Sequence, residues 1–500
     1  MANHRFGATE PNLPDYRMSV VVDQQEELTI ARDCEAGSRR IKQKRIAYLP
    51  QHPKEKLENY SIRLDRPSFF NSYARTTGGL TGMVFRRNPV LNDDVPEQLV
   101  EHWENIDYAG THGDVFAKEV CHDMLVTGHA GILVDFPVVD GRLTRAQEAS
   151  LGIRPFWVHV KKEDILSWRL RIVNGRVVLT QLVLREFVEQ PTGSFGSETV
   201  ERYRVLRKAI DNTDTLEGPV TFEVWEHRDG KTVKTALAGE IRGVDRIPFV
   251  DLYANKIGFL QSKPPLIDLA YLAIRYYQTN SDMLHAAHIA NVPIPVLRGV
   301  AVDEEFEWGP NTALIIDDPA GDAHWMETTG AAIGQTKALL DDMRTEMAVL
   351  GLGILERRPA TGETATAKRI DRSEKDSQLS SAARSLEDGL ERAFAFHAQF
   401  LGVADENGDG GSIMLNKDFL ELNLTPEQIR VYIDAVEKGA LSIQTLWSIL
   451  QEGNALPANF NQDEELARLA AVQPKGTDGE PQVTDGDDTK TDDDTDTDDE

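Results

Sequence analysis

Residues 369–402 predict a single long helix whose two halves differ in kind. In the second half, apolar or aromatic side chains recur at alternating steps of three and four residues, at Leu379, Ala383, Leu386, Leu390, Phe394, His397 and Leu401. This spacing is typical of an amphipathic helix that buries one stripe in a core. The first half, at 371–378, is polar on every face. A helix that is polar all round crosses solvent or faces something other than a core. The fold must therefore hold half of this helix outside its core.

The chain is long enough, at 500 residues, for a large core and two to four domains. Its two cysteines, Cys34 and Cys121, supply neither a disulfide framework nor a cysteine zinc site, which is typical of a reducing compartment. We expect no signal peptide, because the first sixteen residues lack a basic segment followed by an apolar one. We also expect no membrane span, since no run of apolar residues is long enough.

The net charge of −28 is unevenly distributed. Residues 477–500 hold 12 acidic residues and one lysine, a net charge of −11, which leaves −17 for the rest. Such a tail has almost nothing to bury and predicts disorder, either as a solubilising tail or as a partner-binding one. A body this acidic argues against a generic DNA-binding protein, because duplex phosphates favour a basic surface. It remains compatible with a protein that DNA slides past without sticking.

The first 250 residues predict helices followed by antiparallel strands. Helices are expected at 25–49 and 113–128, with aromatic residues and a glycine-rich turn at 66–89 between them, and a buried strand follows at 131–137. From 154 to 253 the period changes to two, and Asn174-Gly175 lies between two β-rich runs, which is a strong hairpin signal. We expect a mostly antiparallel β subdomain here.

Two helical stalks with a small head are predicted next. The segment 264–290 begins with prolines suited to a helix start and is a rod of roughly 40 Å. A second helix is expected at 331–350, and between the two lie short strand candidates at 312–316 and 323–327. After the long helix, 411–424 predicts a strand pair. Three further helices are expected between 425 and 473, the first with a capping box and a C-terminal glycine.

No motif in the sequence predicts catalysis, a cofactor or a metal. Gly230-Lys231-Thr232 ends like a phosphate-binding loop but lacks its first glycine and lies among strands. His285 and His288 have no acidic partner on their helix, so a surface position is the better interpretation. Residues 405–416 imitate a calcium loop, but the twelfth position is an asparagine, and a turn fits better.

The order of these parts resembles the portal proteins of tailed bacteriophages. The resemblance extends over roughly residues 40–455 and rests on sequence stretches that occur in the family's order. These are "YLPQHP" (48–53), "FFNSYARTTGGLTGMVFRRNP" (69–89), "ILSWR" (165–169), "PPLIDLAYLAIRYYQTNSDMLHAAH" (264–288), "VPIPVLRG" (292–299), "ETATAKRIDRSEKDSQLSSAARSLEDGLERAF" (363–394) and "KGALSIQTLWSILQEG" (438–453).

The resemblance implies an α+β portal fold, mainly helical, with a β-rich wing, paired stem helices, a small β-containing clip and a helical crown. Carried onto this chain, it divides the sequence into a flexible N-terminus (1–24), the wing (25–263), a first stem helix (264–291), the clip (292–330), a second stem helix (331–351), a tunnel loop (352–364), a long tunnel helix with wing strands (365–424), the crown (425–473) and a disordered acidic tail (474–500).

The resemblance also implies a function without enzymatic activity. A ring of twelve copies would form at one capsid vertex of the virion, after synthesis in the bacterial cytoplasm, as the conduit for genome packaging and ejection. It would dock the large subunit of the terminase and then adaptor or head-completion and tail proteins. The implied partners also include the major capsid and scaffold proteins, and double-stranded DNA that passes without sequence specificity; no cofactor and no membrane are implied.

Candidate site residues follow from the same resemblance. Those facing the tunnel and DNA would be Arg357, Arg358, Lys368, Arg369, Arg372 and Lys375, and those docking partners on the clip would be Trp308 and Trp325. Arg357 and Arg358 could equally pair with acids of a neighbouring subunit. Two other classes stay open: a helical adaptor or chaperone whose acidic tail binds basic partners, and a metal-dependent enzyme using Asp405, Asn407 and Asp409.

Overall fold

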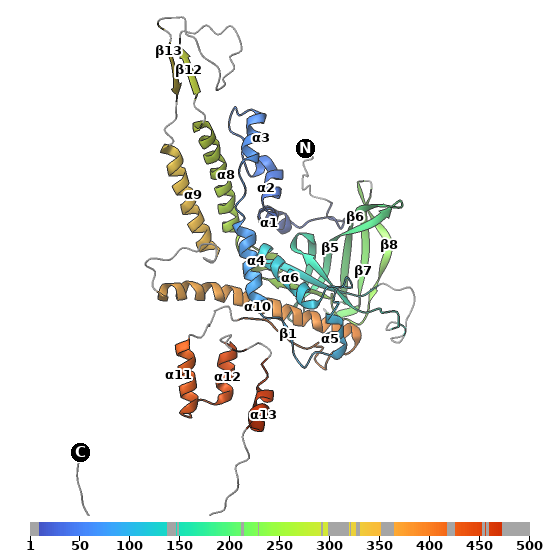
Figure 1. Ribbon diagram of the computed structural model, residues 1–500. Helices are drawn as coiled ribbons and strands as arrows, with labels where there is room; N and C mark the ends of the chain where they lie inside the picture. Colours follow the sequence, from blue (N-terminus) through green and yellow to red (C-terminus); the bar gives the residue numbers. More distant parts are fainter. Residues whose placement is uncertain are drawn as a thin grey trace, which may run out of the picture. The chain divides into compact units, whose positions relative to one another are not determined.

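The computed structural model combines helices and sheets, as an α+β fold requires (Figure 1). It describes residues 10–137, 147, 150–211, 215–228, 230–291, 294–298, 320, 322–326, 331–351, 365–417, 426–452, 456 and 460–472. The chain divides into two compact units, Met1–Phe419 and Leu420–Glu500. None of the described helices is both long enough and apolar enough to cross a bilayer.

The amino-terminal part of the first unit is helical. Its helices are α1 (Ser19–Ala36), α2 (Ser38–Lys44), the 3₁₀ turn η1 (Arg45–Ala47), α3 (Leu57–Asp65), α4 (Ser72–Val84), α5 (Glu97–Trp103) and α6 (Gly113–Thr127). The single helix expected at 25–49 is wrong, because the chain breaks at Gly37, whose φ of 76° lies in the left-handed region that favours glycine. Helix α1 also begins inside the segment 1–24 that sequence predicts to be flexible, and Val21 is buried.

The glycine-rich stretch of 66–89 is a helix, so the predicted turn is wrong. Asn71 caps α4 by accepting a hydrogen bond from the Ala74 amide, at 3.0 Å. The hydroxyls of Thr76 and Thr81 donate to carbonyls four residues back and so remain satisfied inside the helix. A helix rich in glycine is stable here because packing against α1, α6 and α8 outweighs weak intrinsic propensity.

Two antiparallel sheets form the β part. The first has the order β3-β2-β9, from Phe156–Lys161, His129–Asp135 and Phe249–Tyr253. The second runs β4-β5-β6-β7-β8, from Ile165–Val173, Arg176–Thr192, Gly196–Ile210, Leu216–Arg228 and Lys231–Ile241. The hairpin predicted at Asn174-Gly175 is confirmed, and both residues have positive φ, as a two-residue turn of this kind requires.

Short strands close the rest of the first unit. The strands β10 (Lys256–Gly258) and β11 (Gln261–Ser262) pair with each other. Within 411–424 the expected strand pair is wrong for the described part: β14 (Ile413–Met414) pairs instead with β1 (Val90–Leu91), far away in sequence. Residues 418–424 lie outside the described residues. Such a long-range partner leaves no trace in local patterning.

Two long helices, here called the stem pair, follow the sheets. They are α8 (Ile267–Ala290) and α9 (Ala331–Leu350), which lie side by side (Figure 1). Between them in the chain lies an antiparallel ladder of β12 (Ile294–Arg298) and β13 (Asp322–Met326). Strand β13 confirms the strand predicted at 323–327, whereas 312–316 lies outside the described residues. Strand β12 escaped prediction because it contains Pro295, which a two-stranded ladder tolerates since both strands are edges.

Helix α10 (Ala365–Leu401) is continuous over 37 residues, as the sequence predicts. Its apolar stripe is confirmed, since Leu386, Leu390 and Phe394 are fully buried in the main core, where α10 packs against β9 and β2. The second unit holds α11 (Pro426–Glu437), α12 (Ile443–Glu452) and α13 (Gln462–Val472), which confirms the three predicted helices. Gly439, with φ of 72°, follows the end of α11, as the predicted cap requires.

Candidate functional site

The residues that sequence assigns to a tunnel and a clip lie mostly beyond the described side chains. Arg357, Arg358 and Trp308 lie outside the described residues. Lys368, Arg369, Arg372 and Lys375 fall in the amino-terminal part of α10, and Trp325 falls in β13, where it is the ladder partner of Pro295. The described backbone therefore places four of the basic candidates on one helix, and their role stays a prediction.

The stem helix α8 is tied to the loop 48–55 and to α3 by a buried arginine. The Arg63 side chain is only 1% exposed, and its Nε and Nη2 donate to the two carboxylate oxygens of Glu55, at 2.9 and 3.0 Å. Its Nη2 also donates to the Pro50 carbonyl, and Nη1 reaches Asp282 of α8 at 3.3 Å. A guanidinium supplies several donors in a fixed plane, which suits a joint between three chain segments.

Further hydrogen bonds from α8 go to backbone carbonyls of the same region. Gln278 Nε2 donates to Tyr48 at 2.8 Å, Ser281 Oγ to Arg63 at 3.1 Å, and Tyr277 to Leu64 at 3.4 Å. The first of these acceptors, the Tyr48 carbonyl, lies in the segment 48–53, on which part of the portal resemblance rests. Helix α8 is therefore fixed along residues 277–282 to the helical part of the first unit.

A second hydrophobic core surrounds the stem pair. It joins α1, α2, α3, α4, α8 and α9, and its largest buried members include Tyr60, Tyr73, Tyr277, Ile41 and Leu49. From α9, Met347 is fully buried in it. The Arg344 guanidinium of α9 lies 5.4 Å from the ring centre of Tyr276 in α8, a cation–π distance. The stem pair thus has its own core, separate from the one around α10.

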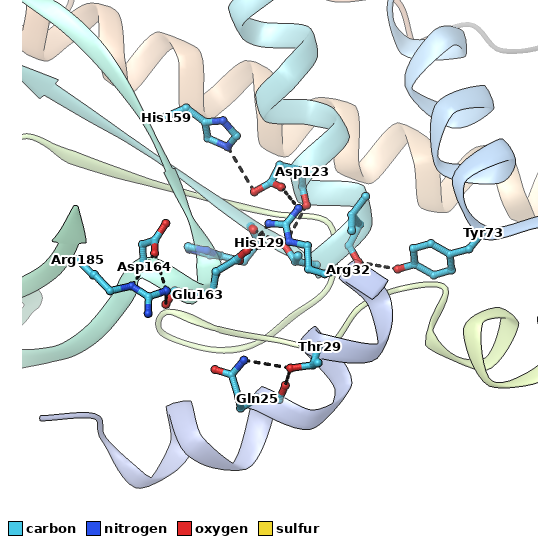
Figure 2. A network of polar contacts seen from close by, with 12 residues as sticks. Gln25, Thr29, Arg32, Tyr73, Asp123, His129, His159, Glu163, Asp164 and Arg185 are labelled. Carbon is cyan, nitrogen blue, oxygen red and sulfur yellow. Dashed lines mark hydrogen bonds and ion pairs between the residues drawn. The ribbon is translucent and has the colours of Figure 1, made fainter. Parts of the chain in front are cut away.

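A buried polar junction joins α1, α6 and β3 (Figure 2). At its centre, Arg32 of α1 pairs with Asp123 of α6 and donates from Nε and Nη2 to the two oxygens of Glu163, at 2.9 and 3.0 Å. His159 Nε2 of β3 lies 3.4 Å from Asp123 Oδ2. The carboxylate of Asp123 is therefore held between a guanidinium and an imidazole.

At this junction the opposite charges outweigh burial and shift the pKa values of Asp123 and Arg32 so that both groups stay charged. Burial alone would raise the pKa of Asp123, but the His159 hydrogen bond and the Arg32 charge outweigh it, and the pKa lies well below its usual range. Burial acts to lower the pKa of Arg32. The charges of Asp123 and Glu163 and their hydrogen bonds raise it by more, so the net shift is upward. Both groups are charged at neutral pH, so the junction is an ion pair that must stay intact.

The 3₁₀ turn η2 (Lys162–Asp164) supplies the neighbouring contacts. Arg185 of β5 donates to Asp164 Oδ1 from Nη2 at 2.9 Å and from Nε at 3.0 Å, which links the two sheets (Figure 2). Lys162 is 1% exposed and its Nζ donates to the Leu260 carbonyl. Burial lowers the pKa of Lys162 to about 8. A lysine enclosed in this way serves as a hydrogen-bond donor to backbone rather than as a surface charge.

Two histidines are buried without charge. Burial lowers the pKa of His129 to about 3, and the nearby Lys162 lowers it further. Burial, His102 and Arg154 do the same for His397, whose pKa is also about 3. His397 Nε2 lies 2.9 Å from His102 Nδ1, a hydrogen-bond distance. His397 was predicted as part of the buried stripe of α10, and this is confirmed, since it is fully buried.

The described side chains offer no metal cluster. Among them, no group of three or more histidine, cysteine, aspartate and glutamate residues lies close enough to hold an ion. Asp405 Oδ1 accepts the amides of Asn407 and Asp409, at 2.9 and 2.7 Å, so this carboxylate stabilises its own loop. Burial raises the pKa of both Cys34 and Cys121 to about 12, which keeps the thiols protonated and unreactive at neutral pH.

Sequence reasoning missed the polar junction. Arg32, Asp123 and Glu163 are far apart in the chain, and each lies in a segment where a charged residue reads as a solvated surface position. The only usable signal was Asp123 within the otherwise apolar run of 120–127, where a charge must find a partner. Long-range packing, not local spacing, creates this joint.

The chain was compared with protein families, with curated proteins and with solved structures. A family model described as "Domain of unknown function (DUF4055)" matches residues 265–401, which hold α8, the β12–β13 ladder, α9 and α10. No curated protein matches the chain.

Among solved structures, the chain is similar to one described as "Neck of empty GTA particle computed with C6 symmetry". The two share 10% identity over 81% of this chain and 90% of that chain, with a TM-score of 0.37. It is also similar to a chain described as "Virion of native gene transfer agent (GTA) particle". Here the identity is again 10% over 81% and 90% of the two chains, with a TM-score of 0.34.

Proposed function

We propose that this protein is the portal protein of a tailed phage or phage-like particle. Copies of the chain form a ring at one capsid vertex, through which double-stranded DNA is packaged and later released. The observation that carries this proposal is the stem pair. Two long helices joined through a small β ladder are fixed to the other helices of the first unit by Arg63 and a dedicated core, and they lead in sequence to the long helix α10.

The proposal accounts for the two unlike halves of α10. The carboxyl-terminal half is buried in the main core, whereas 371–378 are polar on every face. In a ring, that polar half lies against neighbouring copies and the central channel, where there is no core to meet. Lys368, Arg369, Arg372 and Lys375, with Arg357 and Arg358, then contribute isolated positive charge to a channel that is otherwise acidic.

The acidic body has a role in this proposal as well. A conduit must not hold the DNA backbone, because each neutralised phosphate adds affinity that transport then has to overcome. A net charge of −17 outside the tail keeps the average interaction repulsive. Energy for packaging comes from a separate terminase docked on the clip, for which Trp308 and Trp325 are the candidate contacts, and head-completion proteins later take the same place.

Negative-stain imaging of the purified protein, with its mass in solution measured in parallel, tests the proposal. Rings of about a dozen copies with a central hole are expected. A chain that stays monomeric at low and high concentration is then mixed with the scaffold protein of the same particle and examined at raised salt. Failure to form a ring under these conditions as well contradicts the portal proposal and favours the adaptor class.

A further inference from the structure

Three arginines share one side of the β4–β5 hairpin near its turn. The register pairs Arg171 with Val178 and Val173 with Arg176, so Arg171 and Arg176 lie on the same side. Trp168 and Leu170 point into the main core from the alternate positions of β4, which puts Arg169 and Arg171 on the opposite side. The register shifts between Arg169 and Leu170, but the extra residue of this bulge lies in β5. The alternation of side chains along β4 is therefore unbroken.

These arginines differ from the others of the same sheet in having no acidic partner. Five sheet arginines pair with carboxylates, and they are Arg185, Arg202, Arg204, Arg207 and Arg228. Arg169, Arg171 and Arg176 are exposed, and none of them forms an ion pair with any side chain in the described part of the chain. In a protein with a net charge of −28, three adjacent unpaired guanidiniums are an attractive surface for an acidic partner. We call this surface the arginine face.

The same hairpin borders an acidic cavity. The cavity has a volume of about 860 Å³, and its apolar walls include Val177, Val178 and Leu179 of the hairpin, together with Phe249 and Phe396. Its acidic lining consists of Asp94, Asp251, Asp388, Glu391, Asp405 and Asp409. We call it the acidic cavity.

Several of these carboxylates are not neutralised within the chain. Asp388 and Asp409 are exposed, and among the described residues their carboxylates have neither a hydrogen-bond donor nor an ion-pair partner. Burial raises the pKa of Glu391, and the neighbouring charges of Glu387, Asp388 and Asp94 raise it further. Arg392 pairs with Asp251 at 2.9 Å, and Arg246 also lines the cavity, so six carboxyl groups face two guanidiniums. The cavity thus carries surplus negative charge around an apolar interior.

We propose that the arginine face of one copy docks against the acidic cavity of a second copy of this chain. The inference rests on the proposed ring and names one of its subunit contacts. Because the two surfaces are different parts of one copy, the contact is head-to-tail, and a head-to-tail contact generates a ring when its rotation closes. Guanidiniums then meet Asp388 and Asp409, which lack partners inside their own copy.

The charges of both surfaces favour a second copy over DNA or the acidic tail as the occupant. A phosphate backbone, or the Asp- and Thr-rich segment 484–500, can meet the arginine face but leaves the unpaired carboxylates of Asp388 and Asp409 without a cation. A second copy meets both needs, because it supplies an acidic cavity to the arginine face and an arginine face to the acidic cavity. Complementary charge on both surfaces therefore fixes the partner.

Charge reversal tests the contact. The double variant Arg171→Glu/Arg176→Glu should need at least about tenfold more protein for half-maximal ring formation, followed by light scattering and negative-stain imaging. The matched control is Arg86→Glu/Arg87→Glu, which makes the same charge change at exposed positions outside both surfaces and should stay within about twofold of the parent. Asp388→Arg/Asp409→Arg, made separately, should weaken ring formation in the same way.

Combining both reversals separates the possible outcomes. The quadruple variant restores complementarity with exchanged signs and should regain most of the lost ring formation. If the parent forms rings and either double variant assembles equally well, or if the quadruple variant is no better than the doubles, the docking inference is overturned while the portal proposal survives. If the parent forms no ring even with scaffold, the portal proposal fails, and the inference fails with it. Circular dichroism on each variant confirms that the exposed substitutions leave the fold intact.

Discussion

Individual charged side chains hold the first unit together at positions where an apolar core alone would leave segments free to move. Arg32 and Arg63 each bind a carboxylate with two nitrogens and a further group on another element. Such sites are costly to break, because the surviving partner is left buried and charged. In the proposed ring, rigid joints of this kind would keep the stem pair in register with the sheets.

Replacing Arg32 by glutamine is expected to lower the free energy of unfolding by about 2–3 kcal/mol, because Asp123 then remains buried without its main counter-charge. Urea denaturation measures the loss. Arg39→Gln, at an exposed position, is the control and should change stability by less than about 0.5 kcal/mol. Adding Asp123→Asn to Arg32→Gln should cost less than the sum of the single losses; strict additivity would show that the two side chains are not coupled.

The two buried histidines predict that stability falls in acid. His129 and His397 have folded pKa values of about 3, below the ordinary 6.5, so the unfolded chain binds more protons between these values. Their contribution is complete above pH 6.5 and is lost as the pH falls toward 3, at up to about 1.4 kcal/mol per pH unit for each imidazole. Lys162 and Lys256 disfavour a charged His129, whereas Asp251 and Asp123 favour it.

Urea denaturation between pH 4 and 7 measures this slope. His129→Gln should flatten it by about one bound proton, since glutamine cannot titrate. The variant His324→Gln makes the same substitution at an exposed ladder position and is the control. An equal slope in parent and His129→Gln proteins would mean that His129 is protonated in the folded state.

At the scale of helices and strands, the sequence pattern correctly predicted those elements that interactions within a few residues determine. The stripe of α10, the Asn174-Gly175 hairpin and the three carboxyl-terminal helices each follow from spacing, turn conformation or capping within a few residues. The failures have non-local causes. Tertiary packing keeps Gly78 and Gly79 inside α4, and β14 finds its partner β1 across most of the chain. The polar junction and the acidic cavity were invisible for the same reason.

Two glycines inside helices should respond oppositely to alanine. At Gly389 of α10 a Cβ atom would collide with Leu252 of β9, which is itself fully buried, so Gly389→Ala should destabilise by about 1–3 kcal/mol through overpacking. At Gly78 of α4 the added atom meets nothing within 4 Å, so Gly78→Ala should stabilise by up to about 1 kcal/mol through helix propensity. Denaturation midpoints compare the pair, and a stabilised Gly389→Ala protein would refute the close contact between α10 and β9.

For the whole molecule, net charge and assembly oppose each other. Copies that each carry −28 must come together in the proposed ring, so association competes with mutual repulsion that salt screens. The arginine face and the acidic cavity provide attraction at short range, where their opposite charges meet. Long-range repulsion then limits premature assembly, while the short-range contact gives the ring its specificity.

Removing residues 477–500 tests this balance, because it deletes a net charge of −11 and leaves every described residue in place. The truncated protein should form rings at lower salt than the full chain, since less charge needs screening. Light scattering across a salt series gives the midpoint for each protein. A control in which the 12 acidic residues of this segment are changed to asparagine or glutamine keeps the tail length and should behave like the truncation. If truncation instead prevents ring formation while the neutral tail permits it, the tail acts through binding rather than through charge, and electrostatic repulsion is not what limits assembly.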